Sequence, residues 1–209
     1  MKRMCFYIAG AIVAIIFLFL FFVTLKPQKV DMENEKLELL QQKFEEIELK
    51  VIDLTNPCGL KIVGDSAEIP WFEIELKLSE EAEKKLEDGN ETIIVKAFFD
   101  GITNIDNIPK KYKRKYKDRI DYKGIFGGGL HLAQHSIELT DRRLAKFENI
   151  RFSKELYDLL DNKDILLLIN VFSGRKSSMY NLLDFDILQG NMSEIQGKRF
   201  IISGKLIGE

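Results

Sequence analysis

Apolar and charged residues alternate strictly along WFEIELKLS, residues 71–79. The apolar positions are Phe72, Ile74, Leu76 and Leu78, and charged residues stand between them. Because successive side chains of a β-strand point to opposite faces, this stretch predicts a strand with one buried face.

Four other segments have the composition of strands. They are ETIIVKAFFDG (91–101), AKFENIRF (145–152), ILLLINVFSG (165–174) and KRFIISGKLIGE (198–209). Two polar segments between them, opened by Ser79 and Ser153, predict short helices because serine is a preferred N-cap. No long helices alternate with the strands, so we expect residues 55–209 to be mainly β, an antiparallel β-sandwich of about seven strands with short helices.

The stretch GIFGGGLHLAQHSIEL, residues 124–139, holds both histidines of the chain behind three consecutive glycines. Leu130 and Leu132 have one parity along the chain, whereas Ile137 and Leu139 have the other. One inserted residue, a β-bulge, would bring all four to one core face, so we expect a bulged strand entered through a glycine bend.

A zinc site made by His131 and His135 is the alternative interpretation of this stretch, because a spacing of four puts two histidines on one face of a helix. The chain has no further histidine to act as a third ligand. On a strand the two side chains would share a face about 13 Å apart. We therefore expect no metal, no cofactor and no enzymatic activity, and keep a zinc hydrolase as a third hypothesis.

An uncharged apolar run extends from about residue 5 to residue 25, behind Lys2 and Arg3. A membrane-spanning helix needs about 20 apolar residues, and cleaved signal peptides have shorter apolar cores that end in small residues. The sequence predicts a cytoplasmic tail (1–4) and a transmembrane signal anchor (5–25), with a long cleaved signal peptide as the alternative. The following domain would then be exported, which describes a single-pass inner-membrane protein with its C-terminal domain in the periplasm.

The two cysteines, Cys5 and Cys58, would lie on either side of this span and could not pair. We expect Cys58 to be a buried small apolar group, with a free thiol for an intermolecular bond as the alternative.

Residues 30–54 predict an acidic amphipathic helix. Its apolar positions recur in steps of three and four at Leu37, Leu40, Phe44, Ile47, Val51 and Leu54. This seam is typical of a short coiled-coil stalk that would make a homodimer, and equally of one helix lying on its own domain.

The segment PKKYKRKYKDRIDYKG, residues 109–124, is the strongest charge feature of a chain whose formal net charge is only −2. It indicates a surface for an acidic protein or for anionic lipid, with a solvated loop as the alternative. We expect no nucleic-acid binding, because the chain has no global basic excess. The candidate partner-binding residues are Lys110, Lys111, Tyr112, Lys113, Arg114, Lys115, Tyr116 and, in the polar segment 172–185, Arg175.

Three segments, LSEEAEKKLEDGNETIIVKAFFDG (78–101), LLLINVFSGRKSSMYNLLD (166–184) and GKRFIISGKLIGE (197–209), resemble small envelope proteins of Gram-negative bacteria. These are lipoproteins or membrane-anchored sandwiches, often candidate immunity proteins beside type VI secretion effectors. The resemblance implies a protein-binding domain that neutralises a secreted toxin. It carries no motif with defined chemistry, so it assigns no site residue. The alternative function is a structural subunit of an envelope or secretion assembly, dimerised by its stalk helix.

Overall fold

The computed structural model describes residues 37–44, 56–122, 129–140 and 143–209. Of these residues, 44% lie in strands and 25% in helices, so the protein is mainly β, as predicted. Residues 37–44 belong to one compact unit and the other three ranges to a second unit, and each is described by itself. None of the helices in the described ranges is both long and apolar enough to cross a bilayer, and the predicted anchor at residues 5–25 lies outside these ranges.

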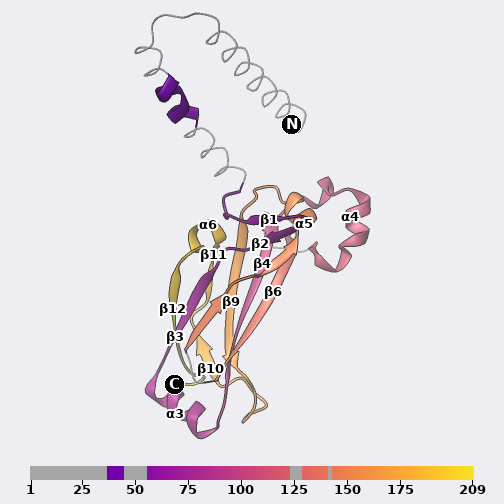
Figure 1. Ribbon diagram of the computed structural model, residues 1–209. Helices are drawn as coiled ribbons and strands as arrows, with labels where there is room; N and C mark the ends of the chain where they lie inside the picture. Colours follow the sequence, from indigo (N-terminus) through magenta and orange to yellow (C-terminus); the bar gives the residue numbers. More distant parts are fainter. Residues whose placement is uncertain (1–36, 45–55, 123–128, 141–142) are drawn as a thin grey trace, which may run out of the picture. The chain divides into compact units, whose positions relative to one another are not determined.

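The second unit contains twelve strands in its described residues (Figure 1). The strands are β1 Lys61–Val63, β2 Ser66–Glu68, β3 Phe72–Leu78, β4 Ile93–Ile102, β5 Ile120–Asp121, β6 Gly129–Leu139, β7 Leu144–Phe147, β8 Arg151–Ser153, β9 Ile165–Ser173, β10 Leu183–Phe185, β11 Leu188–Asn191 and β12 Arg199–Leu206. The helices are α3 Glu80–Asp88, α4 Lys110–Lys115, α5 Lys154–Asp158 and α6 Met192–Ile195, with short 3-10 turns η1 Ile105–Asn107 and η2 Lys117–Arg119.

The strands form three sheets, of order β1-β2-β8, β10-β12-β3-β7 and β11-β9-β4-β6-β5. Every pair is antiparallel except β12 with β3, which run parallel. The expectation of about seven strands, all antiparallel, is therefore wrong in both respects. Parallel neighbours need a crossover connection, and here the chain passes through the whole five-stranded sheet between β3 and β12. No local pattern in either strand carries that information.

The two larger sheets share one core. Phe72 of β3 stacks on Phe147 of β7 with ring centroids 4.8 Å apart. The same ring meets Phe99 of β4 edge-on at 6.2 Å. None of the three side chains is exposed to solvent. Aromatic rings prefer these stacked and edge-to-face arrangements, so Phe72 joins the four-stranded sheet to the five-stranded one.

Helix α3 begins and ends where the sequence predicted. The Ser79 hydroxyl accepts a hydrogen bond from the Ala82 N–H at 3.2 Å, and Gly89 ends the helix. The cap satisfies one of the N–H groups that a helix leaves open at its start.

Strand β6 confirms the predicted bulge. Phe99 of β4 pairs with Ala133, but the next residue, Asp100, pairs with His131, so Leu132 is the extra residue. Leu132 is buried and Ile137 packs against the core, as the parity shift required.

Strand β9 is buried on one face only, although its sequence is apolar at nearly every position. Ile94 pairs with Phe172 and Phe98 pairs with Leu168 on the face of the sheet that points away from the core. Leu168 is 37% exposed. An apolar run in the sequence does not reveal whether another layer covers its second face.

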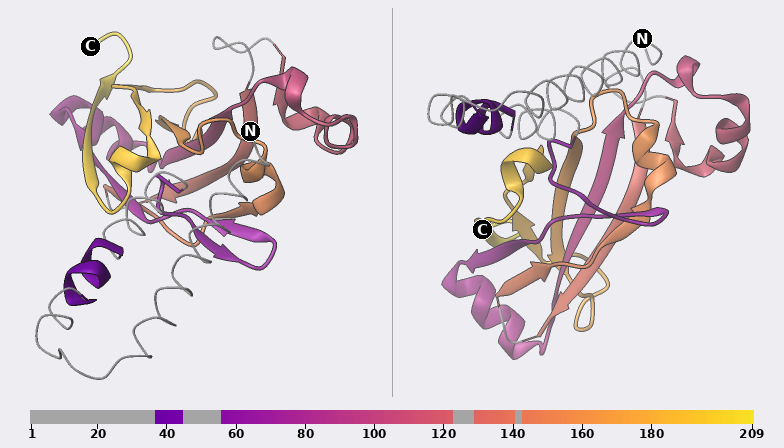
Figure 2. Two further views of the ribbon diagram at one scale, coloured as in Figure 1. Left: turned by 90° about the horizontal axis from the view of Figure 1, so that it is seen from above. Right: turned by 45° about the horizontal axis from the view of Figure 1, so that its top comes forward.

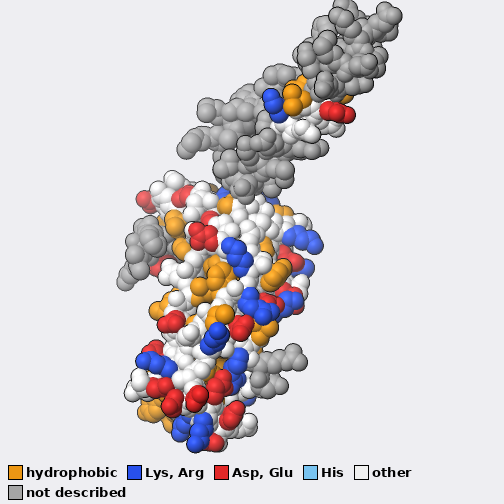
Figure 3. Space-filling view, turned by 90° about the vertical axis from the view of Figure 1, so that its left-hand side faces the viewer, with side chains coloured by type: hydrophobic (Ala, Val, Ile, Leu, Met, Phe, Trp, Pro, Cys, Tyr) orange, Lys and Arg blue, Asp and Glu red, His pale blue; other side chains and the backbone are white. Residues whose placement is uncertain are grey.

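Helix α4 projects from the side of the second unit away from its C-terminus, as both views in Figure 2 show. Figure 3 shows the face on the other side, where acidic and basic side chains are interspersed. The basic segment therefore stands apart from this mixed surface.

Replacing Phe72 by alanine should lower the free energy of unfolding by about 3–5 kcal/mol, because it removes a buried ring that contacts both large sheets. Phe98→Ala is the matched control, since the Phe98 side chain lies on the outer face of β4, and it should cost markedly less. Urea unfolding of the full-length chain in detergent measures both values. Equal losses would show that Phe72 does not join the sheets.

Candidate functional site

Residues 109–119 contain a short helix and a 3-10 turn in place of the expected loop, and most of their side chains are exposed to solvent. Pro109 precedes α4, and its carbonyl accepts hydrogen bonds from the N–H groups of Tyr112 at 2.9 Å and Lys113 at 3.1 Å. A proline suits this place because the N–H that it lacks would have no partner inside the helix.

Two tyrosines fix α4 to the body of the domain. Tyr112 and Tyr116 are four residues apart, their ring centroids lie 6.4 Å apart, and both rings pack against the core. The Tyr116 hydroxyl donates a hydrogen bond of 2.6 Å to Glu155 of α5. Both tyrosines are therefore engaged by the fold, which leaves less of each ring for the partner contact that the sequence suggested.

Glu155 also forms an ion pair with Lys115. Hydrogen bonds from Lys115 and Tyr116 hold the pKa of Glu155 below its usual value, and the bond to Glu155 raises the pKa of Lys115. Both groups are thus charged near neutral pH, and the charge of Lys115 is balanced within the protein.

Five other cationic side chains of this projection have no carboxylate partner among the described residues. They are Lys110, Lys111, Lys113, Arg114 and Lys117. Lys111 lies over the Tyr112 ring, 4.3 Å from its centroid, which does not neutralise its charge. Lys117 was not in the predicted set. We call these five side chains the basic projection.

A groove of about 520 Å³ lies between η2, β6, β8 and α5, next to the basic projection. Its lining includes Arg119, His131, Gln134, Arg151 and Leu156. The Arg119 guanidinium donates a 2.7 Å hydrogen bond to the Leu132 carbonyl. Arg151 is paired with Glu68 at 2.6 Å, whereas Arg119 has no carboxylate partner in the part of the chain that the structure describes.

His131 and His135 lie on opposite faces of β6, which corrects the expectation that they would share one. His131 pairs with Asp100 in the sheet, and its Nδ1 lies 2.8 Å from the Asp100 carboxylate. His135 pairs with Ala97, whose side chain is in the core, and its ring lies 6.1 Å from that of Phe147. The bulge at Leu132 separates them, because one extra residue turns the next side chains to the other face. The described part of the chain contains no group of three or more His, Cys, Asp or Glu side chains that could hold a metal ion.

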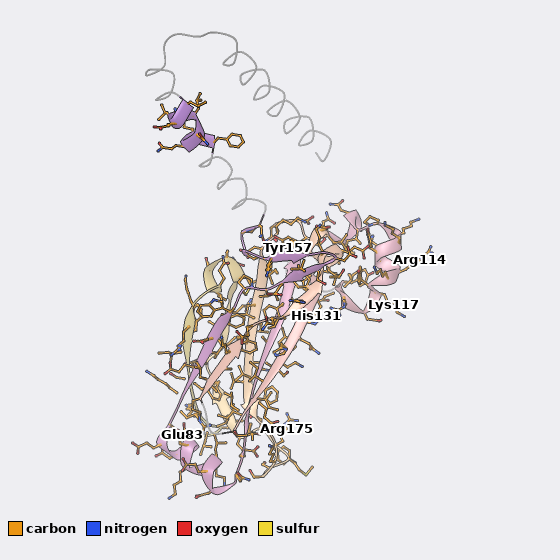
Figure 4. The ribbon with its side chains drawn as sticks, viewed as in Figure 1. Glu83, Arg114, Lys117, His131, Tyr157 and Arg175 are labelled. Carbon is orange, nitrogen blue, oxygen red and sulfur yellow. The ribbon has the colours of Figure 1, made fainter. Side chains whose placement is uncertain are left out.

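Arg175 does not join the other predicted residues. Figure 4 places it at the end of the strands opposite to Arg114 and Lys117. It lies in the loop that follows β9 and has a φ angle of 61°, a left-handed conformation unusual for a residue other than glycine.

The loop that carries Arg175 is fixed by a buried carboxylate, Glu91. Glu91 accepts hydrogen bonds from the N–H groups of Thr92 and Lys176, both at 3.0 Å, and of Ser177 at 2.8 Å. It also accepts one from the Ser177 hydroxyl at 2.8 Å. Burial alone would raise the pKa of Glu91, but these donors lower it to about 2. Nothing in the local sequence distinguishes this glutamate from the exposed acidic residues before it.

Cys58 is buried, as expected, and belongs to a second polar cluster. Its thiol donates to Asp164 at 2.9 Å, and Asp164 accepts a 2.6 Å bond from the Ser193 hydroxyl. Burial and the nearby carboxylate raise the pKa of the Cys58 thiol, so it stays protonated. A protonated thiol is a poor nucleophile, and the cluster connects the segment before β1 to β9 and α6.

Comparison of the chain with protein-family models, with curated proteins and with solved structures found no match.

Glu91→Gln should destabilise the protein near neutral pH and weaken its response to acid. The pKa of Glu91 is below its unfolded value of 4.5, so the stabilisation is complete above that pH and is lost as pH falls towards 2. The shift corresponds to a contribution on the order of 3 kcal/mol to the free energy of unfolding. Urea unfolding of the full-length chain between pH 7 and pH 2.5 should show the gap between the parent and the variant closing with acid.

The matched control for this experiment is Glu87→Gln, an exposed side chain on α3. Its unfolding curve should follow that of the parent at every pH. A gap between the parent and Glu91→Gln that stays constant with pH would contradict the assignment.

Proposed function

We propose that this chain is a single-span, membrane-anchored protein whose exported domain binds an acidic partner protein through the basic projection. The observation that supports it best is the presence, on α4 and η2, of five cationic side chains that have no carboxylate partner among the described residues, on a segment held by the bond from Tyr116 to Glu155. Unbalanced charge of one sign on a surface steers partners of opposite charge and suppresses those of like charge.

The attachment of α4 also favours binding. Tyr112 and Tyr116 hold the helix against the core before a partner arrives. A surface that is ordered in advance loses less conformational entropy on association. Protein binding needs such a surface and no catalytic residue.

For the fold we propose a β-sandwich, in which the four- and five-stranded sheets are the two layers. The contacts of Phe72 with Phe99 and Phe147 support it, because they place side chains of both sheets in one core.

The candidate biological role is that of an immunity protein in the periplasm of a Gram-negative bacterium, neutralising a secreted toxin. The apolar run at residues 5–25 and the resemblance of residues 78–101, 166–184 and 197–209 to envelope proteins support this role. An anchored inhibitor of this kind would meet an incoming toxin at the membrane surface.

Replacing Lys110, Lys113 and Arg114 by glutamate should reduce partner capture at least tenfold, because three attractive charges become repulsive. The full-length chain is purified from detergent-solubilised membranes at low salt, and the bound partner is quantified by mass spectrometry. Lys115 is left unchanged because its charge is already paired with Glu155.

The matched control replaces Lys61, Lys77 and Lys84 by glutamate. These three are exposed on β1, β3 and α3, and the change in net charge is the same. The control should capture the partner as the parent does. Equal capture by all three proteins, or equal loss in both variants, would rule out the basic projection as the binding surface.

A second candidate function is a structural subunit dimerised by the helix at residues 30–54. The observation in its favour is that Leu37, Leu40 and Phe44 are 42–48% exposed on the described part of this helix. An apolar stripe exposed to this extent is stabilised when a second helix covers it.

Replacing Leu40 and Ile47 by aspartate should make the chain monomeric if this stripe joins two copies. Chemical cross-linking of the full-length protein in detergent measures the fraction of dimer. Glu38→Asp with Lys43→Arg serves as the control on the same helix and should leave that fraction unchanged. A dimer that persists in the double aspartate variant would exclude the stalk.

A further inference from the structure

Strand β6 has an open outer edge. On one side it pairs with β4 along its length, but on the other side β5 pairs only with Gly129 and Leu130. Over residues 131–139 no other described strand pairs with this edge, and Figure 1 shows β6 as the outermost long strand of its sheet. An open edge presents backbone N–H and C=O groups that a further strand can use.

Natural proteins usually block such an edge with lysine, proline, a bulge or a covering element. In β6 the bulge at Leu132 and the bond from Arg119 to the Leu132 carbonyl block the edge only around Leu132. The next residues, Gln134, His135 and Ser136, are exposed and include neither lysine nor proline. The middle of β6 is therefore accessible to another chain.

The groove described above lies beside the beginning of this open stretch and reaches it at Ala133 and Gln134. It is lined by residues 131–134 of β6 on one side and by β8 and α5 on the other. Space next to a strand edge is what an extended peptide needs, because its side chains point alternately to the two faces of the sheet.

The charges around the groove favour an acidic occupant. Arg119 uses one nitrogen on backbone carbonyls, and its guanidinium has further N–H donors in a planar fork that suits a carboxylate. Asp118 is the acidic side chain of the lining. Arg114 and Lys117 of the basic projection lie on the same side of the domain as His131 (Figure 4).

We propose that the edge of β6 at residues 133–138 binds an extended, acidic segment of the partner protein as an added β-strand. This inference rests on the proposed function and names the part of the partner that the site accepts. The backbone of β6 supplies hydrogen bonds that do not depend on sequence, Arg119 binds a carboxylate of the segment, and the basic projection attracts it.

The probe is a fluorescent ten-residue peptide in which glutamate and valine alternate, added to the full-length chain in detergent at low salt. Fluorescence anisotropy should show binding at least tenfold tighter than that of the same peptide with lysine in place of glutamate. N-methylation of alternate residues, which removes the N–H groups along one edge of the peptide, should weaken binding at least tenfold. Hydrogen exchange should slow at alternate amides of residues 133–138 when the peptide is bound.

Arg119→Gln should weaken binding of the glutamate peptide several-fold, and Arg175→Gln, at the other end of the strands, is the matched control that should not. Equal affinity for the glutamate and lysine peptides, an N-methylated peptide that binds as well as its parent, or no binding up to about 1 mM would each overturn the proposal. The two proposals can fail separately.

The variant in which Lys110, Lys113 and Arg114 are replaced by glutamate tests partner capture and leaves β6 unchanged. If this variant captures the partner as the parent does and the parent still binds the peptide, strand addition at β6 stands and the basic projection is not the binding surface.

Discussion

The aromatic contact between Phe72 and Phe99 joins the two larger sheets of the second unit. Neither ring is exposed, and each belongs to a different sheet. Because the core face of β4 is fixed in this way, its neighbours β6 and β9 turn their other faces outwards. The open edge of β6 and the groove beside it belong to the same five-stranded sheet.

The fold neutralises some charges and leaves others available. Glu155 balances Lys115, Glu91 is satisfied by the loop after β9, and Asp164 is held by Cys58 and Ser193. These groups stabilise the protein and are not free to bind a partner. In the proposed function the binding specificity comes from the cationic residues of α4 and η2 that have no carboxylate partner among the described residues, since a charge paired inside the protein contributes little to an encounter.

Much of the local structure was predictable because it depends on near neighbours. Alternation predicted β3, the serine cap and glycine predicted α3, and the parity shift between Leu132 and Ile137 predicted the bulge in β6. For the candidate site the sequence indicated the basic segment but not its conformation. It suggested Lys115 and the tyrosines as partner contacts, although Glu155, some 40 residues further along the chain, engages Lys115 and Tyr116.

The sequence by itself determined the mainly β class, the positions of the longer strands β3, β4, β6, β9 and β12, and the concentration of positive charge in one segment. Each of these follows from side-chain periodicity or composition within about ten residues. Only the tertiary structure decided the parallel pairing of β12 with β3, the separation of His131 from His135, the distance of Arg175 from α4 and the open edge of β6. These depend on which strands become neighbours, and that choice is made by packing between residues far apart in the chain, where no local pattern can record it.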